Sequence, residues 1–264
     1  MLLINPYRFA APRSADADVN AYIVAVETAD GQQLEAGVIS AVENFVTGCK
    51  SDGIWNAIKA SCILAGARTL SGALRPLVGT APTNANFVTA DYNRKTGLKG
   101  NASTKRLNAN RLDNVDPQNS KHLSVYQTES EIRNLSGNIA KTAIASPTAT
   151  TASELLTFNT SRRFRANSAA AAAVDSVSSL YFWGASRSGA TAQIMRFNGV
   201  NTNSSLSSAT PSSGAIGVFN RGGTSTSSPS DSRISFYSIG ENLDLALLDT
   251  RVSNLMTALA AAIP

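Results

Sequence analysis

Aromatic, basic and small polar side chains stand close together in the segment SLYFWGASRSG, which spans residues 179–189. Sugar-binding sites combine an aromatic ring, on which the sugar stacks, with amides and a few charged groups on loops. Tyr181, Trp183 and Arg187 are therefore candidate ligand contacts, and the Asn-rich loops near Asn114 and Asn119 are a second source of amides. For Trp183, a place in the core between two sheets is the competing interpretation.

Paired carboxylates, which most glycosidases use for catalysis, are not apparent in the sequence. Between residues 135 and 240 the acidic residues are Glu154, Asp175 and Asp231, and they do not cluster. The single histidine, His122, lies in KHLSVYQT, where we expect a structural or surface position and not the base of a nucleophilic site. We therefore expect no catalytic residues and no enzymatic activity, with cleavage of a glycan as the alternative.

Metal and cofactor sites are not indicated either. Two cysteines, Cys49 and Cys62, are too few for a disulfide scaffold in a chain of this length, so we expect both to be buried free thiols. The sequence has no zinc-ligand spacing. No cluster of Asp and Asn has the spacing of a calcium loop. The sequence thus predicts neither a metal nor a cofactor.

A basic segment, residues 91–111, contains six Lys and Arg residues. It lacks the G-x-x-x-x-G-K-[ST] spacing of a phosphate-binding loop. From residue 93 to residue 111 it also lacks the aromatic residues that single-strand nucleic-acid binders place among basic ones. We expect two extended segments joined at Gly100 and Asn101, with basic side chains facing solvent, at a sheet edge that binds no specific nucleic acid.

The composition is that of an ordinary folded chain with few charges. Its 264 residues suffice for one large domain, 43% of them are hydrophobic, and the net charge is +5. No stretch approaches the roughly 18 apolar residues that a membrane-spanning helix needs, so we expect no membrane insertion. The start, MLLINPYRFAAPR, is interrupted by Pro6 and Arg8 too early for a signal peptide.

Helical patterns occupy the first sixty residues and the end of the chain. A row of apolar residues on one helix face predicts a first helix, with Asp16 or Asp18 as its N-cap and Gly31 at its end. A second such stripe predicts a helix over residues 34–48, and residues 54–58 predict a short third helix. We expect the C-terminal helix to pack on the chain's own body and not to form an oligomerisation helix, because the heptad spacing of its apolar residues lasts only about two heptads. The apolar stripes are Val19, Tyr22, Ile23 and Val26, then Leu34, Val38, Val42, Phe45 and Val46, and finally Leu245, Leu248, Val252, Leu255 and Leu259.

From about residue 60 the pattern changes to short runs rich in Val, Ile, Phe and Tyr, which predict an antiparallel jelly-roll sandwich. We expect an N-terminal arm with helices in residues 1–59, the sandwich in residues 60–241 and the C-terminal helix in residues 242–264. The helices are expected to dock on the sandwich through Val38, Val42, Phe45 and Trp55. The runs expected as strands are SCILAG, ALRPLVG, NFVTADY, HLSVYQT, ELLTFNT, SLYFWGAS, AQIMRFNG, GAIGVFN and RISFYSIG.

The chain also resembles a known family. Bacteriophage virion proteins with a concanavalin A-like lectin/glucanase sandwich contain segments similar to FVTGCKSDGIWNAIKA, PTNANFVTADYNRKTGLKGNASTKRLNAN, NSKHLSVY, GASRSG and FYSIGENLDLALLDTRV. The resemblance covers nearly all of residues 35–262. None of these motifs is catalytic in that family, so no active site carries over.

The resemblance implies a mainly β, concanavalin A-like jelly roll and a non-enzymatic structural protein of the virion, made in the cytoplasm of the bacterial host. It favours an exposed tail or fibre-type component that contacts a host-surface glycan, with a capsid decoration protein as the alternative. Other virion proteins are the expected partners. A homo-oligomer, commonly a trimer in phage appendages, is also expected, and the apolar helix stripes favour it because such surface is unfavourable in water.

Overall fold

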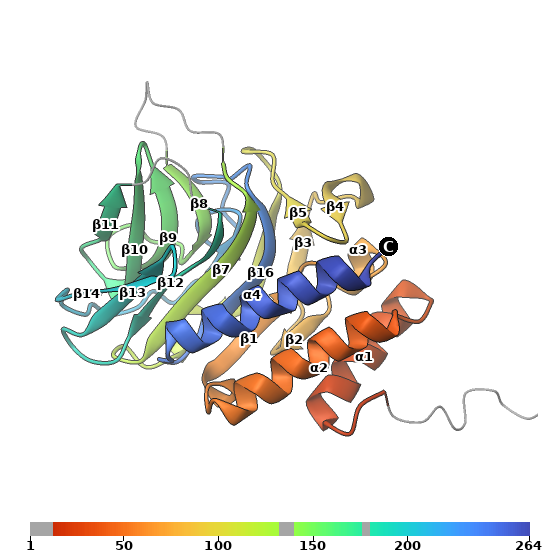
Figure 1. Ribbon diagram of the computed structural model, residues 1–264. Coiled ribbons are helices and arrows are strands. Elements are labelled where there is room, and N and C mark those ends of the chain that lie inside the picture. The colour runs from red at the N-terminus through yellow and green to blue at the C-terminus, as the bar shows by residue number, and fades with distance from the viewer. Residues whose placement is uncertain (1–12, 132–139, 176–179) are drawn as a thin grey trace, which may run out of the picture.

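The computed structural model describes residues 13–131, 140–175 and 180–264. The described residues form two antiparallel sheets packed face to face, with helices over the outer face of one of them (Figure 1). Sheet A has the order β14 (Val200–Ser204), β13 (Gln193–Phe197), β12 (Tyr181–Arg187), β7 (Lys121–Glu129), β16 (Arg233–Gly240), β1 (Ile58–Ile63) and β2 (Pro76–Val78), with β5 (Gly97–Lys99) paired to β16 and β4 (Tyr92–Asn93) to β5. Sheet B has the order β11 (Ala172–Asp175), β10 (Ser161–Ser168), β9 (Ala152–Phe158), β8 (Ala140–Ala145), β15 (Ala215–Val218), β6 (Arg106–Leu112) and β3 (Thr83–Ala85). The predicted two-sheet sandwich is confirmed.

The long helices are α1 (Ala17–Asp30), α2 (Ala36–Ser51) and α4 (Leu245–Ala262), and α3 (Leu70–Ala73) is a single turn. The side chain of Asp16 accepts hydrogen bonds from the first turn of α1, and Gly31 ends that helix with a φ of 67°. Asp244 caps α4 in the same way, through the backbone N–H groups of Ala246 and Leu247. Among the helices of the described chain, none is long and apolar enough to cross a membrane.

One hydrophobic core joins these helices to the outer face of sheet A. Val38, Val42 and Phe45 are buried in it as predicted, Trp55 packs at its edge, and the Phe45 ring meets Phe236 of β16 at 5.6 Å. The C-terminal helix packs on the chain's own body, with Leu245, Leu248, Val252, Leu255, Met256 and Leu259 buried. Because the apolar stripes are buried within one chain, they give no support to the expected homo-oligomer.

A second hydrophobic core fills the space between the two sheets. The Phe164 ring of β10 meets the Trp183 indole of β12 there in an edge-to-face contact at 5.6 Å. Cys62 lies in this core and Cys49 in the first one, and both thiols are buried and unpaired, as predicted. Burial raises the pKa of the Cys49 thiol to about 12, so this thiol is protonated at neutral pH.

Several element predictions were wrong in detail. The expected third helix is one turn of 3-10 helix, η1 (Trp55–Ala57), which leads directly into β1. The run NFVTADY is mostly not a strand, because η2 (Thr89–Asp91) interrupts it, and the Asp91 carboxylate accepts from the Val88 N–H at 2.8 Å. A further 3-10 turn, η3 (Asp113–Val115), follows β6. The proposed boundaries after residues 59 and 241 stay predictions.

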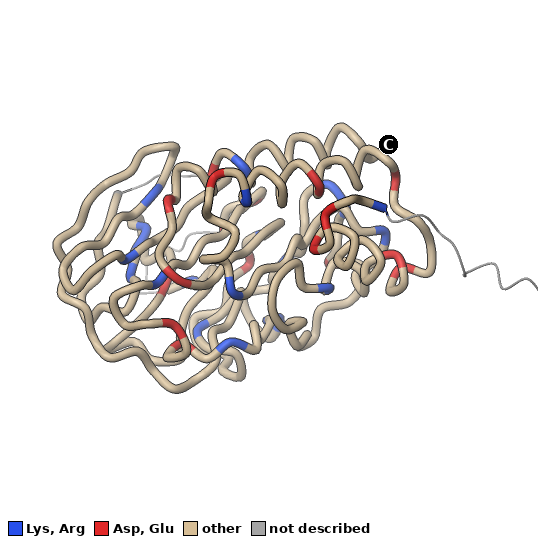
Figure 2. Tube along the Cα trace, turned by 90° about the horizontal axis from the view of Figure 1, so that it is seen from below, with Lys and Arg blue, Asp and Glu red and all other residues tan. Residues whose placement is uncertain are grey.

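The basic segment does not form the expected solvent-facing edge. Its strand β5 belongs to sheet A and β6 to sheet B, so the chain crosses between the sheets at Gly100. A Cβ atom on Gly100 would lie 2.1 Å from the Ser230 carbonyl oxygen, so only glycine fits this crossing. Basic and acidic residues are interspersed along much of the described trace (Figure 2). The ion pairs of the segment are Arg94 with Glu35, Lys99 with Glu129, Lys105 with Asp91, and Arg111 with Asp116.

Candidate functional site

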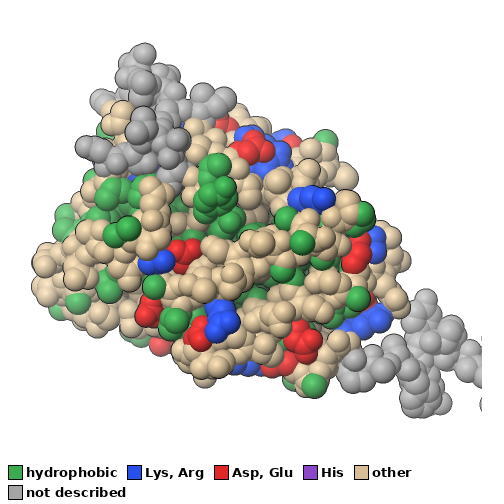
Figure 3. All heavy atoms as spheres, viewed as in Figure 1, with side chains coloured by type: hydrophobic (Ala, Val, Ile, Leu, Met, Phe, Trp, Pro, Cys, Tyr) green, Lys and Arg blue, Asp and Glu red, His purple; other side chains and the backbone are tan. Residues whose placement is uncertain are grey.

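A groove of about 440 Å³ lies on the helix-covered side of sheet A, where β12, the turn between β13 and β14, and α4 meet. We call it the Tyr181 groove. Figure 3 shows this face of the molecule, with hydrophobic side chains exposed above α4. The residues that line the groove are Tyr126, Leu180, Tyr181, Phe182, Asn198, Gly199, Asp249, Ser253 and Thr257.

The helix wall of the groove depends on a close contact between α4 and β12. Gly184 has no side chain on the face toward the helix, and a Cβ there would lie 3.1 Å from Leu245 at the start of α4. This contact places the first turn of α4 directly over β12. Asp249, Ser253 and Thr257 then recur every fourth residue, which aligns them along one side of the helix, facing the groove.

Tyr181 forms the aromatic wall and has an unusual backbone. Its φ is 82°, in the left-handed region that aromatic residues seldom adopt. The residue is 59% exposed, although its ring centroid lies only 5.7 Å from that of the buried Tyr126. Strained residues of this kind persist where the surrounding structure enforces them, and they concentrate at functional sites.

The polar wall of the groove is an ordered network around Asp249. Arg196 of β13 donates from Nε to one carboxylate oxygen of Asp249 at 2.7 Å, and Ser253 donates to the other at 3.0 Å. A second nitrogen of Arg196 donates to the Asn201 side chain at 2.9 Å. Burial raises the pKa of Tyr126 to about 12, so its phenol is neutral beside this carboxylate. The groove therefore offers one open ring face and a fixed set of oxygen acceptors.

The three ligand contacts proposed from the sequence do not come together. Trp183 is only 2% exposed, and its indole lies between the sheets under the Arg162 guanidinium at 4.4 Å, so the core interpretation of this residue is the correct one. Arg187 is fully buried and donates to the backbone carbonyls of Ala166, Gly189 and Ala190. Neither side chain is accessible to a ligand at the surface, because strand alternation turns both toward the inter-sheet core. Of the three, Tyr181 alone reaches a groove.

The Asn-rich loops lie at the other end of the sandwich. Asn114 and Asn119 precede β7, whose first residue, Lys121, pairs with Arg187, whereas Tyr181 pairs with Gln127 near the opposite end of the strand. These amides therefore belong to a different part of the surface. Sequence reasoning missed Asp249, Ser253 and Asn198, and the single available signal was the four-residue spacing of polar side chains on α4.

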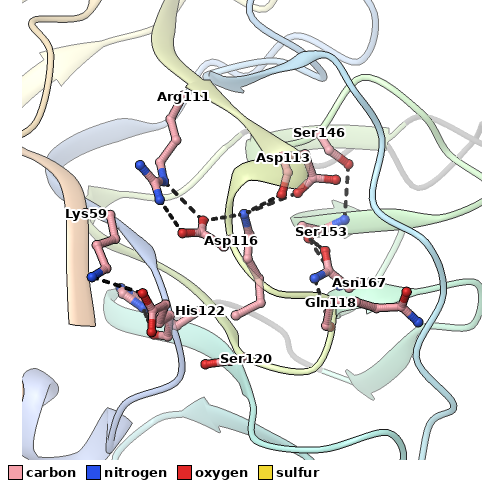
Figure 4. Close-up of polar contacts among 12 residues, drawn as sticks. Lys59, Arg111, Asp113, Asp116, Gln118, Ser120, His122, Ser146, Ser153 and Asn167 are labelled. Atoms are coloured by element: carbon pink, nitrogen blue, oxygen red, sulfur yellow. Dashed lines mark hydrogen bonds and ion pairs between the residues drawn. The ribbon is translucent and has the colours of Figure 1, made fainter.

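A cluster of polar side chains occupies the sandwich end at the start of β7 (Figure 4). The Lys121 ammonium is fully buried and lies 2.8 Å from Asp116, which also binds Arg111. Burial by itself would raise the pKa of Asp116, but the hydrogen bonds and charges of Arg111 and Lys121 outweigh it and hold this pKa below its ordinary value. The cluster is a closed set of ion pairs that stabilises the loop before β7.

His122 makes a contact that resembles part of a catalytic dyad. Its Nδ1 lies 2.5 Å from the backbone oxygen of Glu241 and must carry the proton, so Nε2 accepts from the Ser238 hydroxyl at 2.6 Å. Both residues are fully buried, and burial lowers the pKa of His122 to about 4. A substrate has no access to this serine, and the pair ties β16 to β7.

The acidic residues considered for glycan cleavage are also engaged. Glu154 is buried between Arg165 and Arg221, at 3.1 and 2.5 Å, and Asp231 pairs with Lys141 at 2.7 Å. The side chain of Asp175 lies outside the described part of the chain. In the described residues, no group of three or more His, Cys, Asp and Glu side chains is placed to hold a metal ion.

No family model matches the chain, and a search among curated proteins gives no match. Among solved structures, it is similar to a mutant of Trypanosoma rangeli sialidase displaying trans-sialidase activity, with a TM-score of 0.51 and 12% identity over 84% of this chain and 38% of that one. It is also similar to the botulinum neurotoxin serotype D binding domain, with a TM-score of 0.45 and 12% identity over 75% and 52% of the two chains. The chain thus spans about half or less of the length of these structures. At 12% identity the similarity to the sialidase shows the fold alone, and together with the two antiparallel sheets it confirms the expected concanavalin A-like sandwich.

Proposed function

We propose that the chain is a non-enzymatic structural protein of a bacteriophage particle, and that it contacts a host-surface glycan through the Tyr181 groove. The observation that carries the proposal is the exposed aromatic ring of Tyr181, held at a φ of 82° beside a network of oxygen acceptors. An exposed ring next to fixed polar groups is the combination that sugar recognition requires. The fold is compatible with this role but does not by itself assign it.

The groove supports binding and not cleavage. Hydrolysis of a glycosidic bond commonly needs two carboxylates on opposite sides of the scissile bond. Among the described residues that line the groove, Asp249 is the only carboxylate, and Arg196 holds it in an ion pair at 2.7 Å. Because Arg196 and Ser253 both donate hydrogen bonds to this carboxylate, Asp249 is positioned as a hydrogen-bond acceptor.

The place on the particle rests on the resemblance to phage virion proteins. Within that family we favour an exposed tail or appendage component, with a capsid decoration protein as the alternative. Copies of this chain would form a homo-oligomer, which would attach to other virion proteins. Peptide mass spectrometry of purified particles, followed by a reconstruction in which the chain is located, tests this part. Finding the chain in lysates but not in particles would refute it.

The glycan contact is tested with two variants at similarly exposed residues. Tyr181→Ala removes the ring that forms the groove wall, whereas Val88→Ala truncates the apolar side chain of a residue that is 56% exposed in the loop before η2. On an array of bacterial surface polysaccharides, we expect Tyr181→Ala to bind at least about tenfold more weakly than the unchanged chain, which corresponds to about 1.4 kcal/mol. Val88→Ala should bind as the unchanged chain does. Equal binding by both variants would show that the Tyr181 groove is not the site.

A further inference from the structure

We infer that the Tyr181 groove selects neutral sugar rings over sugars that carry a carboxylate or a sulfate. The inference rests on the proposed function and deepens it, because it names the class of glycan. It follows from the charges that a ligand in the groove would meet.

Asp249 is the only charged residue among the described residues that line the groove. The cation that balances it, Arg196, is not one of these lining residues, and the two side chains are about equally exposed, 12% for Arg196 and 13% for Asp249. Arg196 donates to Asp249 and to Asn201, so these contacts already direct two of its nitrogens away from a ligand. A bound sugar would therefore face the carboxylate and not the guanidinium.

The hydrogen-bonding capacity of the wall matches the hydroxyl groups of a sugar. An ionised carboxylate accepts about four hydrogen bonds, and Arg196 and Ser253 supply one each to Asp249. The remaining positions accept from sugar hydroxyls, which are donors. A carboxylate or sulfate on the ligand brings only acceptors, and its negative charge is repelled by Asp249 at close range.

The aromatic wall adds no charge that would offset this repulsion. Tyr126 is neutral, because burial raises the pKa of its phenol to about 12, and Tyr181 presents a ring face on which any sugar ring stacks. Stacking on Tyr181 therefore supplies affinity for both classes of sugar. The discrimination between them comes from Asp249.

The test compares neutral oligosaccharides with versions of the same backbones that carry a uronic acid, a sialic acid or a sulfate. The unchanged chain should bind the neutral set at least about tenfold more tightly, which is about 1.4 kcal/mol. Asp249→Asn removes the repelling charge and releases Arg196, so acidic sugars should then bind at least as well as neutral ones. In the double variant Asp249→Asn with Arg196→Gln, neither charge remains, and the two sets should bind within about twofold of each other.

A second pair of variants leaves the Asp249 network intact. Thr257 is exposed on α4 and lines the groove, whereas Ala260 is exposed on the same helix but does not line it. Thr257→Lys should shift the preference toward acidic sugars, and Ala260→Lys, which adds the same charge, should not. Tighter binding of acidic sugars by the unchanged chain, or an unchanged ratio in both Asp249→Asn and Thr257→Lys, would overturn the inference while the proposed function stood. Binding of neither set would overturn both.

Discussion

Replacing Tyr181 by glycine and by alanine separates the cost of its backbone from the contribution of its ring. Both variants lose the contact with Tyr126, which has a centroid distance of 5.7 Å. Only glycine removes the penalty of a φ of 82°, because it has no Cβ atom to oppose the preceding and following carbonyl groups. At most strand positions alanine is the more stable of the two residues, so the prediction here is a reversal of the usual order.

The expected difference follows from two opposing effects. A left-handed backbone costs an L-residue roughly 1–2 kcal/mol, and Tyr181→Ala retains that cost. Glycine in a strand costs about 0.5–1 kcal/mol through the greater freedom of the unfolded chain. Tyr181→Gly should therefore be more stable than Tyr181→Ala by about 0.5–1 kcal/mol, which is about 2 °C in melting temperature for a chain of this size. Both variants should lose glycan binding, because the ring is absent from each.

The measurement is thermal unfolding followed by circular dichroism at matched pH and concentration. Thr202, an exposed residue in the middle of β14, provides the control: Thr202→Ala should melt above Thr202→Gly, in the usual order. If Tyr181→Ala melts at or above Tyr181→Gly while the control pair behaves as expected, Tyr181 is not strained. The structural argument for the groove would then fail.

Three further outcomes are expected. Gly100→Ala places a methyl group 2.1 Å from the Ser230 carbonyl oxygen and should lower the free energy of unfolding by about 1–3 kcal/mol, whereas Gly189→Ala, whose nearest contact would be at 3.6 Å, should change it by less than about 0.5 kcal/mol in urea titrations. Burial lowers the pKa of His122 from 6.5 to about 4, so the unfolded chain binds a proton that the folded chain does not. Stability should therefore fall as the pH drops from about 6.5 to 4, by about 3 kcal/mol, and His122→Asn should lack this share of the pH dependence in melts at pH 7.5 and 4.5. Leu248→Asp places a charge where α4 packs on the body of the chain, at a fully buried position, and should unfold the monomer or destabilise it by more than about 4 kcal/mol. If light scattering instead shows a folded monomer that has only lost an oligomeric state, α4 packs between subunits and not on its own chain.

The helices and the more apolar strands could be predicted because their signals are local. The stripe on α1, with Asp16 before it and Gly31 after it, specifies both the buried face and the ends of the helix. The strands that contain HLSVYQT and RISFYSIG can be predicted from their β-branched and aromatic residues. These patterns require no knowledge of what lies across the fold.

Strand β10 shows why other elements could not be predicted. Its sequence, SRRFRANS, turns Arg162 into the inter-sheet core, where the guanidinium binds Glu131 at 2.8 Å and Gln127 at 3.0 Å and stacks on Trp183. A basic residue at an inward position contradicts the alternation of apolar and polar residues by which strands are recognised. The partner that makes its burial tolerable is thirty-one residues away in the sequence, so no local pattern reveals the pair.

The groove depends on a single departure from strand alternation. With a period of two, residues 181, 183 and 187 would share one face of β12. Trp183 and Arg187 obey the alternation and are buried between the sheets. The left-handed backbone at Tyr181 breaks it, so its ring lies on the helix side with Tyr126, which pairs with Phe182 across the strands. A tyrosine in this conformation has no sequence signature, because the conformation is imposed by the packing around it and not by its own preference. The left-handed backbone at Tyr181 thus cannot be predicted from the sequence, yet it brings an aromatic ring to Asp249, sixty-eight residues further along the chain. Together, this ring and this carboxylate form the surface on which we expect a neutral sugar to bind.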